Sequence, residues 1–189
     1  TLLTSLFPPD IGAPAPYVKE LAYRLSHESV ALLLYGNLPE SVPDIEYYCI
    51  DKRTILPIRL FQFTKTLYSL RKETDVLLVQ NGPSTELPAL IVSYLCNTSM
   101  VLCISDVRAD HASRNRRLYG MIHRLLRKRV HQTISIIDTQ PPTDKKISAP
   151  LDAPEILPFA ESDNDSTTYE ESWTKHLDAL MKIFHHVTK

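Results

Sequence analysis

Two hydrophobic periodicities alternate along this chain, and the alternation constrains its fold more than any other feature. Short runs that are apolar almost throughout, such as residues 30–35, 75–80 and 100–104, predict buried strands. Between them, apolar residues recur three and four positions apart, as in residues 18–25 and 60–70, which predicts amphipathic helices. Strands of this kind separated by helices are typical of a parallel sheet covered on both faces. We therefore expect an α/β fold, a single Rossmann-like domain with a mostly parallel sheet and helices on both faces.

The pattern divides the chain into three parts. Residues 1–137 carry the alternating pattern, residues 138–168 form an acidic, proline-rich stretch that we interpret as a linker, and residues 169–189 predict a final helix. Thr168 and Glu171 have the spacing of a capping box at its start. Trp173, Leu177 and Leu180 then recur at helical spacing. We expect this apolar stripe to pack back on the first part.

Composition excludes several classes of protein. The net charge of −1 argues against a generally basic nucleic-acid binder, and no segment approaches the ~20 apolar residues that span a bilayer. The chain contains neither GxGxxG nor GK[ST], and its Cys, His, Asp and Glu residues do not have metal-ligand spacing, so we expect no cofactor and no metal. Three cysteines without a CxxC pair favour a reducing, cytoplasmic location, and Cys49 and Cys103 lie in apolar runs that predict burial.

Two strand-to-helix loops are the first candidate binding elements. Asp10, Gly12 and Ala13 follow the first strand, and Asn81, Gly82 and Ser84 follow the fourth, where Ser84 is also a candidate helix cap. In a doubly wound sheet ordered 3-2-1-4-5, strands one and four are neighbours, and ligands bind outside their carboxyl ends. Both loops would then line one crevice and bind an acceptor. The alternative is a pair of ordinary turns.

Asp106 and His111 follow the fifth strand and are candidate catalytic residues. An aspartate and a histidine beside a ligand-binding crevice have the chemistry of a general base or a substrate ligand. The alternative is an aspartate that caps a helix and a histidine on the surface.

Charge is unevenly distributed along the chain. Residues 108–132 carry a net charge of +7 and residues 52–72 carry +6, whereas residues 138–172 carry −7. A basic amphipathic helix can lie on anionic lipid or bind phosphates. The candidate residues for this contact are Arg114, Arg116, Arg117, Arg124, Arg127 and Lys128. The alternative is a solvated face partly neutralised by the acidic stretch. Aromatic residues hardly interleave with the basic ones here, which argues against nucleic acid as a partner.

The order of these pieces resembles glycosyltransferase family 4. Residues 4–25, TSLFPPDIGAPAPYVKELAYRL, are similar to the opening of these enzymes, residues 75–84 to their middle section, and residues 172–180 to their terminal helix. The resemblance covers residues 1–137 and about 170–187. It implies a GT-B architecture, in which an N-terminal domain binds the acceptor, a second Rossmann-like domain binds the sugar nucleotide, and the terminal helix crosses back onto the first domain.

The sequence departs from that family in three places. About thirty residues separate the sixth predicted strand from the closing helix, which leaves no room for a donor domain with its Glu-x7-Glu motif. The second loop glycine is Ala13, and the usual His-Asp pair after the fifth strand reads Ser105-Asp106.

Three hypotheses follow from the match and these departures. The chain is the acceptor-binding half of a glycosyltransferase, with a separate donor-binding subunit and a sugar or lipid-linked acceptor at the inner face of an anionic membrane. Alternatively, it is a non-catalytic binding or scaffold module that kept the fold and lost the chemistry. The third hypothesis is a gene fragment or truncated product.

Overall fold

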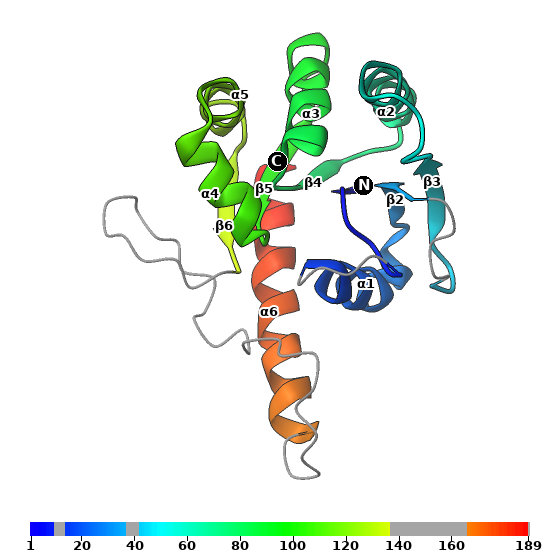
Figure 1. Ribbon diagram of the computed structural model, residues 1–189. Coiled ribbons are helices and arrows are strands. Elements are labelled where there is room, and N and C mark those ends of the chain that lie inside the picture. Colours follow the sequence, from blue (N-terminus) through cyan, green and yellow to red (C-terminus); the bar gives the residue numbers. More distant parts are fainter. Residues whose placement is uncertain (10–13, 37–41, 137–165, 189) are drawn as a thin grey trace.

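A computed structural model describes residues 1–9, 14–36, 42–136 and 166–188, and these residues form one α/β unit (Figure 1). Its core is a six-stranded sheet in the order β3-β2-β1-β4-β5-β6, in which every neighbouring pair is parallel. The strands are β1 (Leu2–Thr4), β2 (Ala31–Tyr35), β3 (Glu46–Ile50), β4 (Val76–Gln80), β5 (Ser99–Ile104) and β6 (Gln132–Ser135). The expected Rossmann-like fold is confirmed, and so is the neighbouring position of the first and fourth strands.

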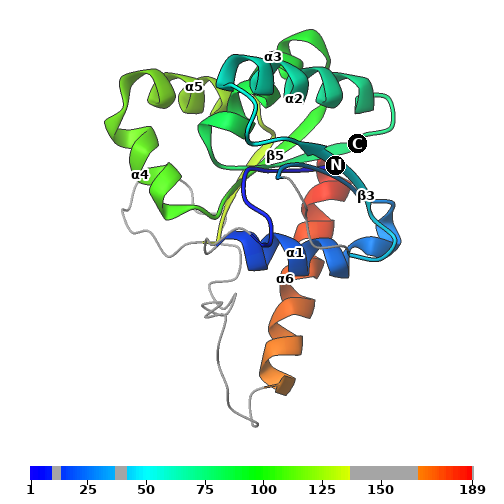
Figure 2. The same ribbon diagram turned by 45° about the vertical axis from the view of Figure 1, so that its right-hand side comes forward.

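Helices cover both faces of the sheet. They are α1 (Pro14–Arg24), α2 (Leu56–Leu70), α3 (Pro83–Leu95), α4 (Val107–Asn115), α5 (Arg117–Arg127) and α6 (Ser166–Val187), with a short 3₁₀ turn η1 (Ser26–Glu28) after α1. In Figure 2, α2, α3 and α5 lie above the sheet, whereas α1 and α6 lie below it. None of the helices in the described part of the chain is both long and apolar enough to cross a membrane.

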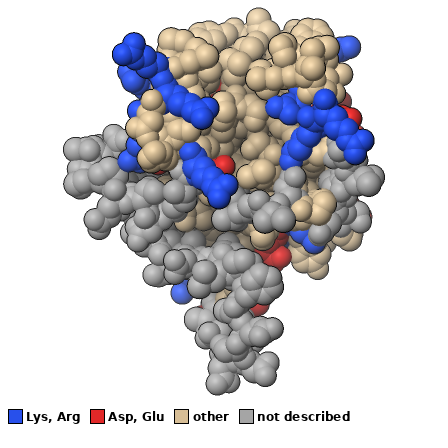
Figure 3. Space-filling view, viewed as in Figure 1, with Lys and Arg blue, Asp and Glu red and all other residues tan. Residues whose placement is uncertain are grey.

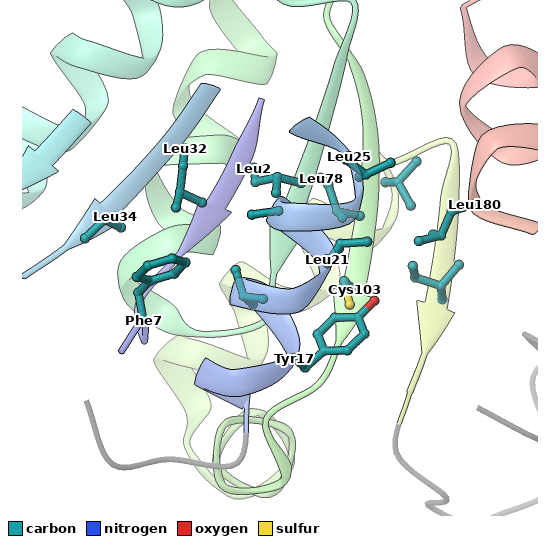
Figure 4. Packing of buried hydrophobic residues seen from close by; sticks show 14 of the residues in the cluster. Leu2, Phe7, Tyr17, Leu21, Leu25, Leu32, Leu34, Leu78, Cys103 and Leu180 are labelled. Carbon is teal, nitrogen blue, oxygen red and sulfur yellow. The ribbon is translucent and has the colours of Figure 1, made fainter. Parts of the chain in front are cut away.

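Apolar residues alternate along the strands between two cores. Leu32 and Leu34 of β2 pack with α1 and α6, whereas Leu33 between them packs against the opposite helices. Because successive strand side chains point to opposite faces, a strand that is apolar throughout serves both cores. Figure 4 shows the first core, in which Tyr17 and Leu21 of α1 lie over the sheet. The second core contains Phe63 of α2 and residues of α3 and α5.

The edge strand β3 departs from the expectation that both faces of the sheet are dry. Cys49 on this strand is exposed, although Cys103 on β5 is buried as predicted. Strand β3 pairs only with β2 and has partly exposed residues along its length. An apolar run on an edge strand therefore does not guarantee burial, and the predicted burial of Cys49 is wrong.

Two helix starts and one additional helix differ from the sequence-based expectation. Helix α3 begins at Pro83 with Gly82 as its cap, so Ser84 lies within the first turn and is not the cap. Proline is favoured at the first helical position because its missing N–H would have no helical partner there. Helix α4 is separate from α5, and the sequence indicated it only through the alternative in which Asp106 caps a helix. Helix α6 begins at Ser166, so the predicted start near Thr168 is too late; apolar periodicity locates packing residues better than helix ends.

The final helix packs back on the domain as expected. Trp173, Leu180 and Val187 are buried in the core that contains α1. The Trp173 ring stacks on Tyr17 with centroids 5.7 Å apart, and the Ser99 hydroxyl donates to the carbonyl of Val187. Helix α6 therefore contacts both α1 and the start of β5.

Candidate functional site

The carboxyl ends of β1, β4 and β5 lie side by side at one edge of the sheet, which we call the carboxyl edge. Three connections leave it, from β1 to α1, from β4 to α3 and from β5 to α4. The chain order reverses between β1 and β4, because β2 and β3 lie on one side of this pair and β5 and β6 on the other. Ligands of open α/β sheets bind at such a reversal. The carboxyl edge is therefore the candidate site.

A row of polar side chains links the three strands directly beneath this edge. The Thr4 hydroxyl at the end of β1 contacts Oε1 of Gln80 at the end of β4. Nε2 of Gln80 donates to the Ser105 hydroxyl after β5, at 2.9 Å. Thr4 and Gln80 are buried, so their polar atoms need internal partners. The row fixes the relative positions of the strand ends from which the loops depart.

Asn81 clamps the β5–α4 connection to β4. Its Oδ1 accepts hydrogen bonds from the backbone N–H groups of Ser105 and Asp106, at 2.9 and 2.8 Å. Its Nδ2 donates to the carbonyl of Asp106 at 2.8 Å, and the residue is fully buried. The structure gives Asn81 this internal role; its predicted contact with an acceptor stays a prediction.

Gly82 connects β4 to α3 in a backbone conformation that side chains disfavour. Its φ of 155° lies in the region that L residues rarely adopt. Its N–H donates to Oε1 of Glu86, one turn into α3, at 3.0 Å. The backbone N–H of Gly82 is therefore already engaged, while Ser84 is half-buried in the first turn of the helix.

Glu86 is a fully buried carboxylate that ties α3 to α5. Its Oε1 accepts from the Tyr119 hydroxyl at 2.6 Å, and its Oε2 lies 2.9 Å from Nδ1 of His123. Burial, and the negative charge of Glu86, raise the pKa of Tyr119 well above its usual range. From its position alone, Glu86 is only a favourably placed acid in the first turn of a helix. Tyr119 and His123 lie more than thirty residues away from it, and no local pattern indicates them.

The candidate catalytic pair is not brought together as an acid and a base. Oδ1 of Asp106 accepts from the N–H groups of Arg108 and Ala109, at 2.8 and 3.2 Å, so this carboxylate caps α4. His111 is exposed in the second turn of α4, with Asn115 Nδ2 3.0 Å from its ring nitrogens. The described contacts match the alternative of a capping aspartate and a surface histidine. A catalytic role for either residue stays a prediction.

The β1–α1 connection is described only up to Pro9. The candidate residues Asp10, Gly12 and Ala13 lie outside the described residues. The helix that follows begins at Pro14 and has Pro16 in its first turn. Since proline has no N–H, two of the donors that a helix start usually offers to an anion are missing here.

A second polar cluster extends from the row beneath the carboxyl edge into the α1 and α6 side. The Cys103 thiol interacts with the Ser105 hydroxyl and with the Tyr17 hydroxyl, which lies beside it in Figure 4. The Tyr17 hydroxyl also lies 2.9 Å from Nε2 of His176 on α6. Burial raises the pKa of Cys103 to about 12, which keeps the thiol protonated and unreactive at neutral pH. Burial lowers the pKa of His176. Within the described residues, Nδ1 of His176 and Nε1 of Trp173 have no hydrogen-bond partner.

The basic residues predicted to meet a membrane or phosphates are all exposed, on α4, on α5 and at the end of α5. Arg114 pairs with Asp110 one turn earlier, at 2.8 Å, so part of its charge is neutralised within α4. Arg117 and Arg124 lie on α5, and Lys128 caps its carboxyl end. The basic set therefore belongs to the helix layer, apart from the polar row at the carboxyl edge.

Comparison with known proteins identifies no matching family model and no matching curated protein. The carboxyl edge is consequently interpreted from its own geometry. It offers hydroxyl and amide groups held in place by hydrogen bonds, without a described pair of groups arranged for proton transfer.

Proposed function

We propose that this chain is the acceptor-binding half of a sugar-nucleotide-dependent glycosyltransferase, and that a separate chain binds the donor. The observation that carries the proposal is the strand order, because the β1–β4 reversal brings the loops after both strands to one edge. The buried row of Thr4, Gln80 and Ser105 fixes the strand ends beneath that edge and so holds in place the loops that would bind a polyhydroxylated ligand.

Two further features support the proposal. Helix α6 packs on the domain formed by residues 1–136, which agrees with the resemblance to glycosyltransferase family 4. The stretch between β6 and α6, residues 137–165, is much shorter than an ordinary domain. A donor-binding unit would therefore have to come from elsewhere.

Saccharide titration of the isotope-labelled chain, followed by amide NMR, tests the acceptor role. We expect glucose, mannose, N-acetylglucosamine or their octyl glycosides to shift the amides of Leu6, Gly82 and Ser105 at the carboxyl edge. Uridine diphosphate, which represents the donor, should leave these signals unchanged. Shifts confined to other parts of the chain, or produced by the nucleotide alone, would contradict the proposal.

A pair of matched variants locates the saccharide site. Ser84→Arg adds a bulky side chain to the first turn of α3, and we expect it to abolish the saccharide shifts. Ser69→Arg makes the same change at an exposed position in the last turn of α2, away from the carboxyl edge, and should leave the shifts intact. Equal effects of both variants would argue against binding at the edge.

The second candidate function is a binding module without catalysis. It is favoured by the internal hydrogen bonds of Ser105 and Asp106, the two residues at the position of the family's His-Asp pair. Ser105 accepts a hydrogen bond from Gln80, and the Asp106 carboxylate caps α4. Capture of partners from cells that make the chain naturally, followed by assay for sugar transfer, separates the two functions. A recovered partner that binds nucleotide sugars and shows transferase activity supports the transferase function. In that complex, Ser105→His should change the rate of sugar transfer only if the carboxyl edge takes part in catalysis.

A further inference from the structure

Large apolar side chains are exposed mainly on one layer of the molecule, formed by α2, α3 and α5. Phe61 on α2, Leu95 on α3 and Leu118 on α5 are exposed by 68%, 65% and 69%. Among the described residues, the exposed large apolar side chains outside this layer are Tyr23 and Tyr169. Helix α3 lies between α2 and α5 and contacts both. The exposed apolar groups therefore share one face, which we call the outer helix face.

Helix α5 mixes basic and apolar side chains along its solvent-facing stripe. Its buried side carries Tyr119, Ile122 and Leu126. Arg117, Met121, Arg124 and Lys128 recur at spacings of four and three, on the opposite side. Met121 is 51% exposed between Arg117 and Arg124. This is the pattern of a helix that lies at a bilayer surface, with basic groups near phosphates and apolar groups directed inward.

Helix α2 exposes apolar side chains with one lysine among them, and α3 contributes an uncharged stripe. On α2, Phe63 and Leu67 are buried, whereas Ile58, Phe61 and Lys65 lie on the opposite side. On α3, the exposed large side chains are Ile91, Tyr94 and Leu95. Figure 3, in which this face lies at the top and is seen in profile, shows Lys and Arg side chains toward the α5 side and toward the α2 side, with mainly uncharged atoms along the top between them. The exposed residues named above give the outer helix face an apolar centre on α3, with basic groups along α5 and Lys65 on α2.

Negative charge is missing from this face. Over residues 52–72, 83–95 and 116–131, the only acid in the sequence is Glu86, which is fully buried. Ordinary soluble surfaces intersperse both signs of charge. A second copy of the chain that docked by the same face would oppose basic flanks to basic flanks, which is unfavourable. An anionic bilayer offers negative phosphates and an apolar interior together.

We propose that the outer helix face docks on a bilayer that contains anionic lipids. The exposed basic side chains of α5 and Lys65 of α2 bind lipid phosphates, and Phe61, Leu95 and Leu118 enter the boundary between headgroups and acyl chains. The expected contact of the α5 arginines thereby becomes part of a surface that spans three helices. The proposal does not rest on the acceptor-binding function, because it concerns a different face.

Vesicle binding with charge-matched variants tests the electrostatic part. The chain is expected to sediment with vesicles of phosphatidylcholine containing about one third phosphatidylglycerol at low salt, and to be released at high salt or on pure phosphatidylcholine. Arg117→Glu with Arg124→Glu should weaken binding roughly thirty-fold or more, since each basic group near an anionic surface contributes substantially. Lys175→Glu with Lys182→Glu, two exposed positions on α6, changes the net charge equally and should have little effect.

A fluorescent reporter locates the inserted side chains. Phe61→Trp and Leu118→Trp should show a blue shift of the added tryptophan emission on anionic vesicles, whereas Tyr23→Trp on α1 should not. All three positions are exposed, so folding should be retained, and circular dichroism checks this. A blue shift at Tyr23→Trp, equal losses for the two charge variants, or no binding to anionic vesicles would overturn the proposal. If the chain self-associates without lipid and Phe61→Ser abolishes this, the face binds a second copy of the chain instead. If it binds an acidic protein but not vesicles, the face binds a protein partner.

Discussion

Asn81 is the residue on which the geometry of the carboxyl edge depends most. It occupies the first position after β4. Its side chain supplies hydrogen-bond partners to backbone groups of the β5–α4 connection that would otherwise have none. Backbone groups buried without partners are costly, so a single amide side chain accounts for the position of Asp106 and hence for the start of α4.

Replacement of this amide is expected to destabilise the fold. Asn81→Ala removes three hydrogen bonds to Ser105 and Asp106 and should lower the free energy of unfolding by about 3 kcal/mol. Urea unfolding measures the change. Asn97→Ala, at an exposed position after α3, is the matched control and should change the free energy by less than about 0.5 kcal/mol. A small effect at Asn81 would mean that water replaces the amide.

His176 gives the stability of the fold a dependence on pH. Burial lowers its pKa in the folded chain, so the unfolded chain takes up a proton first as the pH falls. The neutral His176 side chain contributes fully to the free energy of unfolding above about pH 6.5, and this contribution declines at lower pH. The groups that face its ring, the Tyr17 hydroxyl and the Trp173 indole, carry no charge in this range, and neither does the neighbouring Cys103 thiol.

Urea unfolding between pH 5 and 8 checks this dependence. The parent chain should lose stability as the pH falls below about 6.5. His176→Gln should show a weaker decline over the same interval, because its side chain does not titrate. His27→Gln changes an exposed histidine and should follow the parent curve. Parallel curves for the parent and His176→Gln would show that other groups cause the decline.

At the scale of elements, α6 completes the packing of one face of the sheet. Its rings contact Tyr17, and Arg24 of α1 pairs with Glu170 at 2.8 Å. That ion pair is largely exposed on the Glu170 side, so it adds little stability. The buried Trp173 and Leu180 account for most of the attachment, since apolar burial provides the larger free energy.

The attachment predicts that α6 unfolds together with the sheet. Trp173 is the only tryptophan in the chain, so its fluorescence reports the docking of α6, whereas far-ultraviolet circular dichroism reports all helices and strands. The two signals should follow one urea transition with the same midpoint. A fluorescence change at clearly lower urea would show that α6 detaches first. Trp173→Phe identifies the origin of the signal.

The strands and most helices could be predicted because their apolar periodicities differ. Helix α4 was anticipated only in the alternative in which Asp106 caps a helix, because it carries only small or scattered apolar residues between Asp110, Arg114 and other polar groups. The end positions of α3 and α6 were shifted for a related reason. Packing residues are periodic, whereas caps depend on local hydrogen bonds that a pattern does not specify.

At the scale of the whole molecule, the order of the strands was expected correctly because right-handed crossovers leave few ways to connect parallel strands by short helices. The chemistry of the edge was not predictable to the same extent. Glu86, Tyr119 and His123 come together only after α3 and α5 pack, and Tyr17 of α1 meets Cys103 of β5 and His176 of α6 only when α1 and α6 pack on the sheet. Contacts between distant segments carry no signal in the local sequence.

The whole molecule also presents two surfaces of different character. The carboxyl edge is polar and fixed by hydrogen bonds, whereas the outer helix face is apolar and basic. The carboxyl edge lies at the ends of the strands, whereas the outer helix face is the solvent side of α2, α3 and α5, so substitutions on one should leave the other unchanged. This independence lets the two proposals be tested in one purified chain.

The position of α6 has a consequence for how the protein is made. The residues that cover the α1 side of the sheet, 166–187, follow every strand in the sequence. At ordinary translation rates, ribosomes need on the order of several seconds to add the stretch from β6 to the end of α6. During that interval a nascent chain leaves the apolar surface around Val101 and Ile134 uncovered. Newly made molecules are therefore expected to engage chaperones at this stage, before the closing helix reaches its place.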